Sequence, residues 1–323
     1  MAIATRTTSL PTVRGTLEHA APFSDFIWFR CGGAAEWLFR PADLADLSDF
    51  LRALPARTPV FPVGVGSNLI VRDGGVKGVT VRLPKSFATV RVEGNRVRAG
   101  AAAMGITVAT AARDAGIAGL EFLRGIPGTV GGSVRMNAGA YGRDVTDILI
   151  EAVIVTRAGE TETWPAERFG FGYRHSAVPE GSIVVEALFE GTPGKKYAIA
   201  AEMERIAAER EASQPLRSRT GGSTFRNPPG RKAWQLVDAA GCRGMTVGGA
   251  QVSEKHTNFL INTGTATSAD IEALGEEIRK RVKDHSGIEL EWEIDRVGVP
   301  AAPRPGTNPG PCVGPVAGSG ASE

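Results

Sequence analysis

Two glycine-rich stretches offer backbone that could hold a ligand. The stretch 125–142 reads GIPGTVGGSVRMNAGAYG, with six glycines in eighteen residues, and the shorter PVGVGSN occupies 62–68. Glycine lets backbone N–H groups approach an anion with no side chain in the way. Either stretch alone also fits a tight turn or a packed loop. Together they favour a dinucleotide held by loops.

The shorter stretch matches neither common nucleotide fingerprint. It lacks the third glycine of GxGxxG and the GK[ST] of a P-loop, and we expect another strand rather than a helix after it. Ser67 and Asn68 add polar groups to its glycine turn. By itself, the stretch suits either a phosphate-binding loop outside a Rossmann unit or a tight turn between buried strands.

Composition limits the class of protein. The 323 residues are 42% hydrophobic and 22% charged, which allows a large core and favours about two domains. A net charge of +2 gives no overall case for a nucleic-acid or membrane partner. The distant cysteines Cys31, Cys242 and Cys312 predict neither a disulfide framework nor a metal site. With no secretory signal or membrane-length apolar run, we expect a cytoplasmic protein.

Hydrophobic periodicity predicts a mixed chain. The stretch 42–54 after Pro41 reads as a helix, as do 197–212 and 270–286. Strands are expected at 79–83, 88–94, 95–101, 148–156, 160–164 and 183–190. EGN at 93–95 and RAGE at 157–160 are expected hairpin turns. We expect loose ends, with 300–323 disordered because it is built of Pro, Gly, Ala and Ser.

Five motifs in order carry a family resemblance. They are PVGVGSN, GLEFLRGIPGTVGGSVRMNAGAYG, FGYRHS, GGSTFRNPPG and GIELEWEIDRVG. They resemble the UDP-N-acetylenolpyruvoylglucosamine reductases of bacterial peptidoglycan synthesis over about Pro22 to Val299. The resemblance implies an α+β fold, with a two-part FAD-binding domain of the vanillyl-alcohol-oxidase type and a smaller α/β substrate domain.

The resemblance also implies domain ranges. The N-terminal extension is 1–20, the FAD-binding domain is 21–190 with its two parts divided near 85, the substrate domain is 191–299, and the tail is 300–323.

The implied reaction needs two partners and one cofactor. NADPH would reduce FAD, and hydride from the reduced flavin N5 would reach the enolpyruvyl group of the UDP sugar, giving UDP-N-acetylmuramate. None of the four histidines, His19, His175, His256 and His285, lies in a glycine-rich stretch, so we expect non-covalent FAD. We expect a monomer with no metal, nucleic-acid or membrane partner.

By resemblance, the two glycine-rich stretches wrap the FAD. The implied cofactor-binding residues are Gly64, Val65, Gly66, Ser67, Asn68, Gly125, Ile126, Pro127, Gly128, Thr129, Gly131, Gly132, Ser133, Asn137, Ala138 and Gly139.

The motifs also imply three catalytic residues. Arg174 would bind the substrate carboxylate, Glu293 would act with it on the enolate-like state, and Ser223 would donate the proton. Judged without the family, Arg174 reads as a surface arginine, Glu293 as a solvated strand residue and Ser223 as a turn or cap residue.

Five residues outside the catalytic set are candidates for substrate binding. Implied or polar candidates are Tyr173, Arg226, Asn227, Lys255 and His256. No acidic residue occurs between Glu211 and Asp238, whereas basic residues occur at Arg217, Arg219, Arg226, Arg231 and Lys232. This local positive charge suits a diphosphate, although an ordinary basic loop is the alternative.

The chain departs from the family at three points. Gln235 stands where many relatives carry a cation, Asp295 stands where arginine is frequent, and the short span from Arg174 to Ser223 indicates the shorter type II subclass. A related FAD oxidoreductase and a nucleotide-sugar-binding module remain alternative interpretations.

Overall fold

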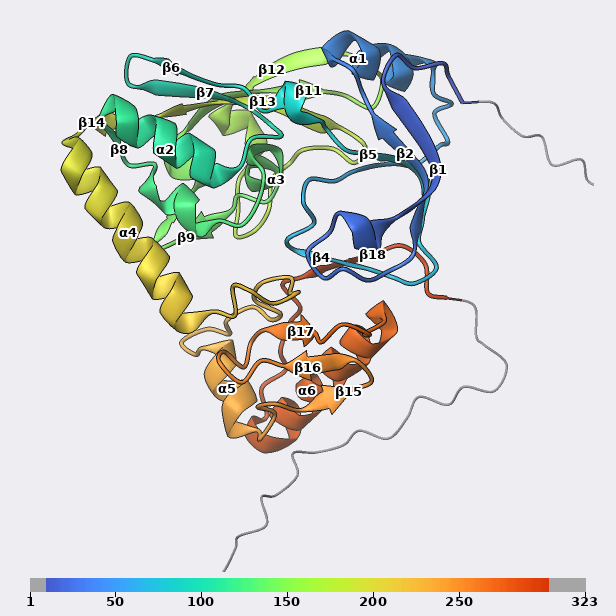
Figure 1. Cartoon of the computed structure of the whole chain (residues 1–323), viewed down its shortest axis with the longest axis vertical. Helices are drawn as coiled ribbons and strands as arrows, with labels where there is room; N and C mark the ends of the chain where they lie inside the picture. Colours follow the sequence, from blue (N-terminus) through green and yellow to red (C-terminus); the bar gives the residue numbers. More distant parts are fainter. Residues whose placement is uncertain (1–9, 302–323) are drawn as a thin grey trace, which may run out of the picture. The chain divides into compact units, whose positions relative to one another are not determined.

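The computed structural model describes residues 10–301, which divide into two compact units (Figure 1). Unit 1 comprises 10–19, 37–64 and 78–203, and unit 2 comprises 20–36, 65–77 and 204–301. The predicted domains follow the chain consecutively, whereas these units interleave in sequence. The predicted boundaries stay a proposal. Beyond Ala301, the tail that we predicted to be disordered lies outside the described residues.

A five-stranded antiparallel sheet forms the centre of unit 1. Its order is β12-β11-β13-β7-β6. The strands are β6 (Val90–Glu93), β7 (Arg96–Gly100), β11 (Leu149–Val155), β12 (Thr161–Pro165) and β13 (Ile183–Glu190). Both predicted hairpins are confirmed, since β6 pairs with β7 and β11 pairs with β12 in antiparallel register.

Helices α2 (Gly105–Ala115) and α3 (Val130–Arg135) pack with this sheet around one apolar cluster. The sequence indicated neither helix, and α3 lies inside the stretch interpreted as glycine turns. It forms because Val130 and Val134, one turn apart, are both buried. The backbone N–H groups of Val130 and Gly131 also donate to the carbonyls of Ala103 and Ala101.

A second sheet of unit 1 has the order β1-β2-β5-β3. Its strands are β1 (Thr16–Pro22), β2 (Ala34–Arg40), β3 (Val60–Pro62) and β5 (Val76–Val81), and β1, β2 and β5 continue past the unit boundary. Helix α1 (Leu44–Ala53) confirms the predicted helix.

The prediction of a loose N-terminal extension over 1–20 is wrong for its described part, because β1 begins at Thr16. The buried side chain of Asp46 binds the residues just before β1. Its carboxylate accepts from the backbone N–H groups of Arg14 at 2.8 Å and Gly15 at 2.9 Å.

Unit 2 is built on long helix α6 (Ser268–Ser286), which confirms the predicted helix. Its Thr267–Asp270 capping box and left-handed Gly287 define its two ends. Helix α6 packs with a three-stranded sheet of order β15-β16-β17 and with α5. These elements are α5 (Ala233–Ala239), β15 (Thr246–Val247), β16 (Ala250–Val252) and β17 (Leu260–Asn262).

Short strands β4 (Leu69–Val71) and β18 (Asp295–Val297) form a parallel pair in unit 2. Helix α4 (Lys196–Ser213) confirms the predicted helix, and the unit boundary falls within it. The remaining elements are β8 (Ile117–Ala118), β9 (Gly139–Ala140), β10 (Arg143–Asp144), β14 (Thr192–Pro193), η1 (Phe23–Asp25), η2 (Lys85–Phe87), η3 (Glu121–Gly125), η4 (Val145–Asp147) and η5 (Ala166–Phe169). Within residues 10–301, no helix is both long and apolar enough to cross a membrane.

Candidate active site

The two glycine-rich stretches meet within unit 1 at Gly64. A Cβ placed on Gly64 would lie 2.5 Å from Thr129 Oγ1, so only a glycine allows this approach. The stretch 62–68 leaves β3 and enters β4, and these strands pair with β5 and β18 respectively. The expected strand after Asn68 is therefore present, and the stretch is not a simple hairpin turn.

The rest of the shorter stretch belongs to unit 2. Gly66 has a φ of +58°, and a Cβ there would lie 2.5 Å from Ile27 Cγ2. Val65, Ser67 and Asn68 are half-buried. Its last residue, Asn68, bonds the segment that carries Glu293: Nδ2 donates to the Glu293 carbonyl at 3.1 Å, and its own carbonyl accepts from the Asp295 N–H at 3.1 Å.

The longer stretch combines a loop, helix α3 and strand β9, and it ends directly before β10. A Cβ on Gly125 would lie 2.7 Å from Tyr141 Cε2, and one on Gly131 would lie 3.0 Å from Ala101 Cβ. Gly132 is different, because it is exposed and its nearest neighbour, Thr129 Oγ1, would be 3.7 Å away. The glycines therefore serve two purposes: Gly125 and Gly131 allow packing, whereas Gly132 leaves backbone open.

Ser133 tests whether this stretch fits a dinucleotide. It is buried, and its hydroxyl has no hydrogen-bond partner among the described residues. Buried hydroxyls are normally satisfied, so a polar group of a bound ligand would complete its bonding. Such a hydroxyl, beside the open backbone of Gly132, fits a dinucleotide such as FAD. Half-buried Ile126, Pro127, Gly128, Ala138 and Gly139 contribute further small or apolar surface.

Arg174 lies in unit 1 at the tip of a tight turn. Gly172 and His175 exchange backbone hydrogen bonds of 3.1 and 3.2 Å across it. Arg174 has a φ of +53°, which is uncommon outside glycine. Its Nη2 donates to the Gly139 carbonyl at 3.0 Å, and its Cζ lies 5.0 Å from the centre of the Tyr173 ring. Tyr173 itself is 58% exposed.

Ser223 and Glu293 lie on neighbouring backbone in unit 2. The Glu293 N–H donates to the carbonyl of Thr224, the residue after Ser223, at 2.8 Å. Ser223 also forms an antiparallel bridge with Phe259. Both candidate side chains are half-buried. The fold thus brings together two of the three predicted catalytic residues, although they are separated by seventy positions in the sequence.

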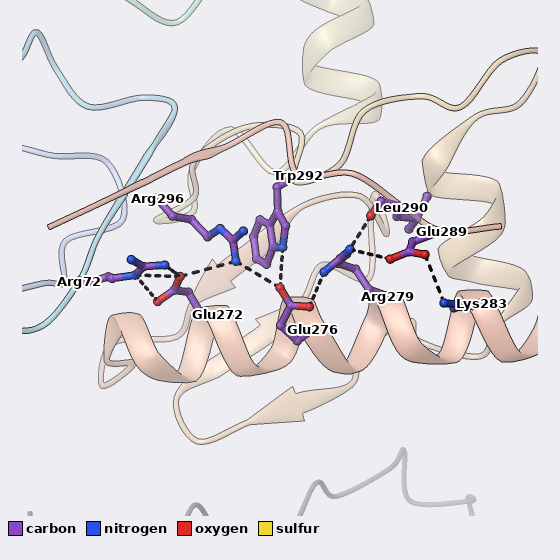
Figure 2. A network of polar contacts seen from close by, with 9 residues as sticks. All are labelled: Arg72, Glu272, Glu276, Arg279, Lys283, Glu289, Leu290, Trp292 and Arg296. Atoms are coloured by element: carbon purple, nitrogen blue, oxygen red, sulfur yellow. Dashed lines mark hydrogen bonds and ion pairs between the residues drawn. The ribbon is translucent and has the colours of Figure 1, made fainter. Parts of the chain in front are cut away.

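A polar network on α6 holds the segment that carries Glu293 (Figure 2). Trp292 Nε1 donates to Glu276 Oε1 at 2.8 Å, and Arg296 Nη1 donates to the same oxygen at 3.2 Å. Arg279 donates to the Leu290 carbonyl at 2.8 Å and to Glu276 Oε2 at 2.6 Å. Residues on both sides of Glu293 are therefore bonded to one helix.

The network extends at both ends through ion pairs. Arg72 donates to Glu272 at 3.1 Å, and Lys283 donates to Glu289 at 3.2 Å. Burial alternates along this segment: Leu290 and Ile294 are buried, whereas Glu289 and Glu291 are exposed. Asp295, the departure from the family pattern, is exposed in β18.

The polar candidates for substrate binding have different structural partners. Exposed Arg226 lies 3.9 Å from Glu291, and Asn227 Oδ1 accepts from the Ala233 N–H at 2.9 Å at the start of α5. Exposed Lys255 donates to the Glu211 carbonyl. Burial lowers the pKa of His256, whose Nδ1 accepts from the Asn258 N–H at 3.3 Å. This burial favours the neutral imidazole.

Basic side chains of this region face solvent. Arg217, Arg219, Arg226, Arg231 and Lys232 are all exposed. Gln235, at the position where many relatives carry a cation, is exposed as well. The region therefore keeps its positive charge at the surface.

The structure gives structural roles to two residues to which the sequence assigned none. Asn258, which sequence reasoning missed, is buried. Its side chain accepts from the Phe225 N–H at 3.0 Å and donates to the Phe225 carbonyl at 2.8 Å, which fixes the segment after Ser223. A lone asparagine before an apolar strand was the only available signal. Arg135, to which the five motifs assign no role, donates to the Val178 carbonyl at 3.4 Å.

Comparisons with known proteins agree with both halves of this description. Residues 35–164 match a family model for an FAD binding domain, and residues 214–297 match the C-terminal domain of UDP-N-acetylenolpyruvoylglucosamine reductase. A reductase of that name from Sphingopyxis alaskensis is 66% identical over 293 residues, covering 90% of this chain and 98% of its own. One from Rhizorhabdus wittichii is 65% identical over 297 residues, covering 92% and 97%.

A solved structure is also similar. The crystal structure of UDP-N-acetylenolpyruvylglucosamine reductase from Thermus caldophilus has a TM-score of 0.76 and 32% sequence identity, covering 88% of this chain and 99% of that one. The predicted family, α+β class, enzyme class and FAD cofactor are confirmed. The chain therefore belongs to the UDP-N-acetylenolpyruvoylglucosamine reductase family of flavin-dependent oxidoreductases.

Proposed function

We propose that the protein reduces UDP-N-acetylenolpyruvoylglucosamine to UDP-N-acetylmuramate, with NADPH as reductant, in peptidoglycan precursor synthesis. The observation that carries the proposal is identity of 66% to a named reductase over nine-tenths of the chain. When bound, FAD would supply the redox chemistry that links NADPH to the enolpyruvyl group. The remaining chemistry belongs to residues of this chain.

FAD would be held by the two glycine-rich stretches. The contact of Gly64 with Thr129 joins them, and Ser133 offers a buried hydroxyl that lacks a partner among the described residues. Backbone and small side chains in these stretches would exclude water and fix the orientation of the cofactor without adding reactive groups.

Arg174 and Glu293 are proposed to act on the charge that develops in the substrate. Hydride addition to an enol ether of pyruvate pushes charge toward the carboxylate-bearing carbon, and a fixed guanidinium stabilises that charge. The planar fork of Arg174 suits a carboxylate and would also fix its geometry. The hydrogen bond of its Nη2 to Gly139 favours one orientation of this long side chain.

Ser223 is proposed to deliver the proton to the carbon next to the carboxylate. A serine hydroxyl is a weak acid, so the oxygen left behind needs a nearby donor or a water relay. The backbone hydrogen bond between Glu293 and Thr224, the residue after Ser223, supports a joint role for Ser223 and Glu293. The exposed basic residues around Ser223 are proposed to attract the UDP diphosphate.

Anaerobic stopped-flow absorbance tests this proposal. NADPH should bleach the bound flavin, and the enolpyruvyl UDP sugar should then restore its absorbance. A flavoprotein that NADPH reduces but the sugar does not reoxidise would be a different FAD oxidoreductase. A protein that binds the sugar with no flavin spectrum would be a binding module.

A further inference from the structure

Asn137 occupies an unusual position between α3 and β9. It is 4% exposed and has a φ of +43°, in the left-handed region that asparagine adopts more readily than most residues. It lies two residues before Gly139, whose carbonyl accepts from Arg174. A buried asparagine here requires partners for its whole amide.

Every bonding group of the Asn137 side chain is used within unit 1. Nδ2 donates to Asp144 Oδ2 at 3.2 Å and to the Gly172 carbonyl at 3.1 Å. Oδ1 accepts from the N–H of Thr146 at 3.1 Å and from its hydroxyl at 3.0 Å. A primary amide has two donor hydrogens and two acceptor lone pairs, so this amide is saturated. It has no group left for a hydrogen bond to a cofactor.

The bond to Gly172 reaches the base of the Arg174 turn. Gly172 is the residue that exchanges backbone bonds with His175, and Arg174 lies between them in a left-handed conformation. The Arg174 guanidinium returns to the same segment through its bond to Gly139. The stretch 137–139 thus holds the Arg174 turn at two points, one on its backbone and one on its side chain.

We propose that Asn137 is a positioning residue for Arg174, clamping the turn 172–175 onto the hairpin 139–144, rather than a direct FAD contact. The catalytic part of this inference rests on the proposed role of Arg174. The clamp itself is a statement about the protein's own bonds and can be measured separately.

Two substitutions separate the bonds of the amide. Asn137→Gly removes all four bonds and tolerates a positive φ, which alanine does not. Asn137→Asp keeps the acceptor for Thr146, loses the donor to Gly172, and places a negative charge beside Asp144. Asn95→Gly, in the exposed β6-β7 turn, is the matched control.

The first readout is hydrogen exchange of full-length holoenzyme. Deuterium uptake by peptides covering 170–178 should rise in Asn137→Gly and in Asn137→Asp, and should not change in Asn95→Gly. Unchanged uptake in both Asn137 variants would overturn the clamp. This result does not depend on the reaction that the enzyme catalyses.

The second readout combines FAD affinity with turnover. Both Asn137 variants should lower kcat for the enolpyruvyl sugar by about tenfold or more, while the FAD dissociation constant changes by less than about threefold. In an Arg174→Ala background, adding Asn137→Gly should lower kcat by less than about a further twofold, because the effect of Asn137 acts through Arg174. A tenfold weaker FAD affinity with losses that multiply in the double variant would overturn the inference. Wild-type enzyme that is inactive on this sugar would instead refute the proposed function, and the exchange result would still decide on the clamp.

Discussion

Two of the three proposed catalytic residues, Ser223 and Glu293, are held in place through their backbones. Glu293 is bonded at its N–H to Thr224 and at its carbonyl to Asn68. Ser223 forms a backbone bridge to Phe259. A change of either side chain keeps these bonds, so we expect such variants to fold and to report on chemistry.

Ser223→Ala should separate the two halves of the reaction. NADPH should still reduce the flavin at close to the wild-type rate, because that step needs no proton from serine. Reoxidation by the enolpyruvyl sugar should slow by about 10²- to 10⁴-fold, the usual contribution of a general acid. Stopped-flow absorbance measures both steps, and Ser218→Ala is the matched control. Reoxidation at the wild-type rate would remove Ser223 from the mechanism.

Secondary-structure elements determine what the glycine-rich and catalytic segments can do. Helix α3 sets Gly131 against Ala101 and leaves Gly132 exposed, so adjacent glycines have different roles. Helix α6 holds Trp292 and Arg296 through one carboxylate, that of Glu276, on either side of Glu293 (Figure 2). Each arrangement leads to a prediction.

Gly132→Leu should weaken FAD binding without destabilising the apoprotein. Its side chain would enter open space in the proposed cofactor stretch, and we expect the FAD dissociation constant to rise by about tenfold or more. Gly131→Leu is the matched contrast, because its side chain collides with Ala101 and should lower the apoprotein melting temperature. Flavin fluorescence titration and thermal unfolding measure the two effects. FAD affinity unaltered in Gly132→Leu would place the cofactor elsewhere.

Glu276→Gln should destabilise the protein in a pH-dependent way. Burial raises the pKa of Glu276, but hydrogen bonds from Trp292 and Arg279 outweigh it, so the folded pKa is lowered. A lowered carboxyl pKa stabilises the folded state above the unfolded pKa of about 4.3, and this contribution disappears as pH falls through the folded value.

The variant should therefore lose about 1 kcal/mol or less at pH 7, since the network is partly exposed. The difference from wild type should shrink below about pH 4. Urea unfolding at several pH values measures the difference in the free energy of unfolding. Glu277→Gln is the control, because Glu277 lies on the same helix and forms a separate ion pair with Arg281. A difference that is constant across this pH range would contradict the assignment.

At the scale of the molecule, residues 10–301 divide into two units that interleave in sequence, and β1, β2 and β5 each cross a unit boundary. Each unit has its own apolar core. Arg174 and most of the cofactor stretches lie in unit 1, whereas Ser223 and Glu293 lie in unit 2.

Acid precipitation of the holoenzyme should release all of the flavin into the supernatant. None of the four histidines lies in the stretches 62–68 or 125–142, so no imidazole is available there for covalent attachment. Absorbance near the flavin maximum, measured in supernatant and pellet, checks this. Yellow colour that remains with the washed pellet would show a covalent bond.

Local patterns were sufficient for much of the fold and for the family. The period-2 strands with their EGN and RAGE turns predicted two hairpins correctly, and the leucine and isoleucine spacing of α6 predicted that helix. These features depend on neighbours within a few residues, which a sequence displays directly. The five ordered motifs likewise identified the family.

Tertiary contacts decided the rest. Glycine content argued against helix α3, which burial of Val130 and Val134 stabilises, and β1 exists because a sheet pairs it. The adjacency of Ser223 and Glu293, and the saturation of Asn137 by Asp144, Thr146 and Gly172, are likewise invisible in the sequence. The amino-acid sequence alone indicated the local conformation of the two hairpins and of helices α1, α4 and α6. Only the folded chain determined which polar groups satisfy one another, because bonds between distant residues depend on packing rather than on spacing.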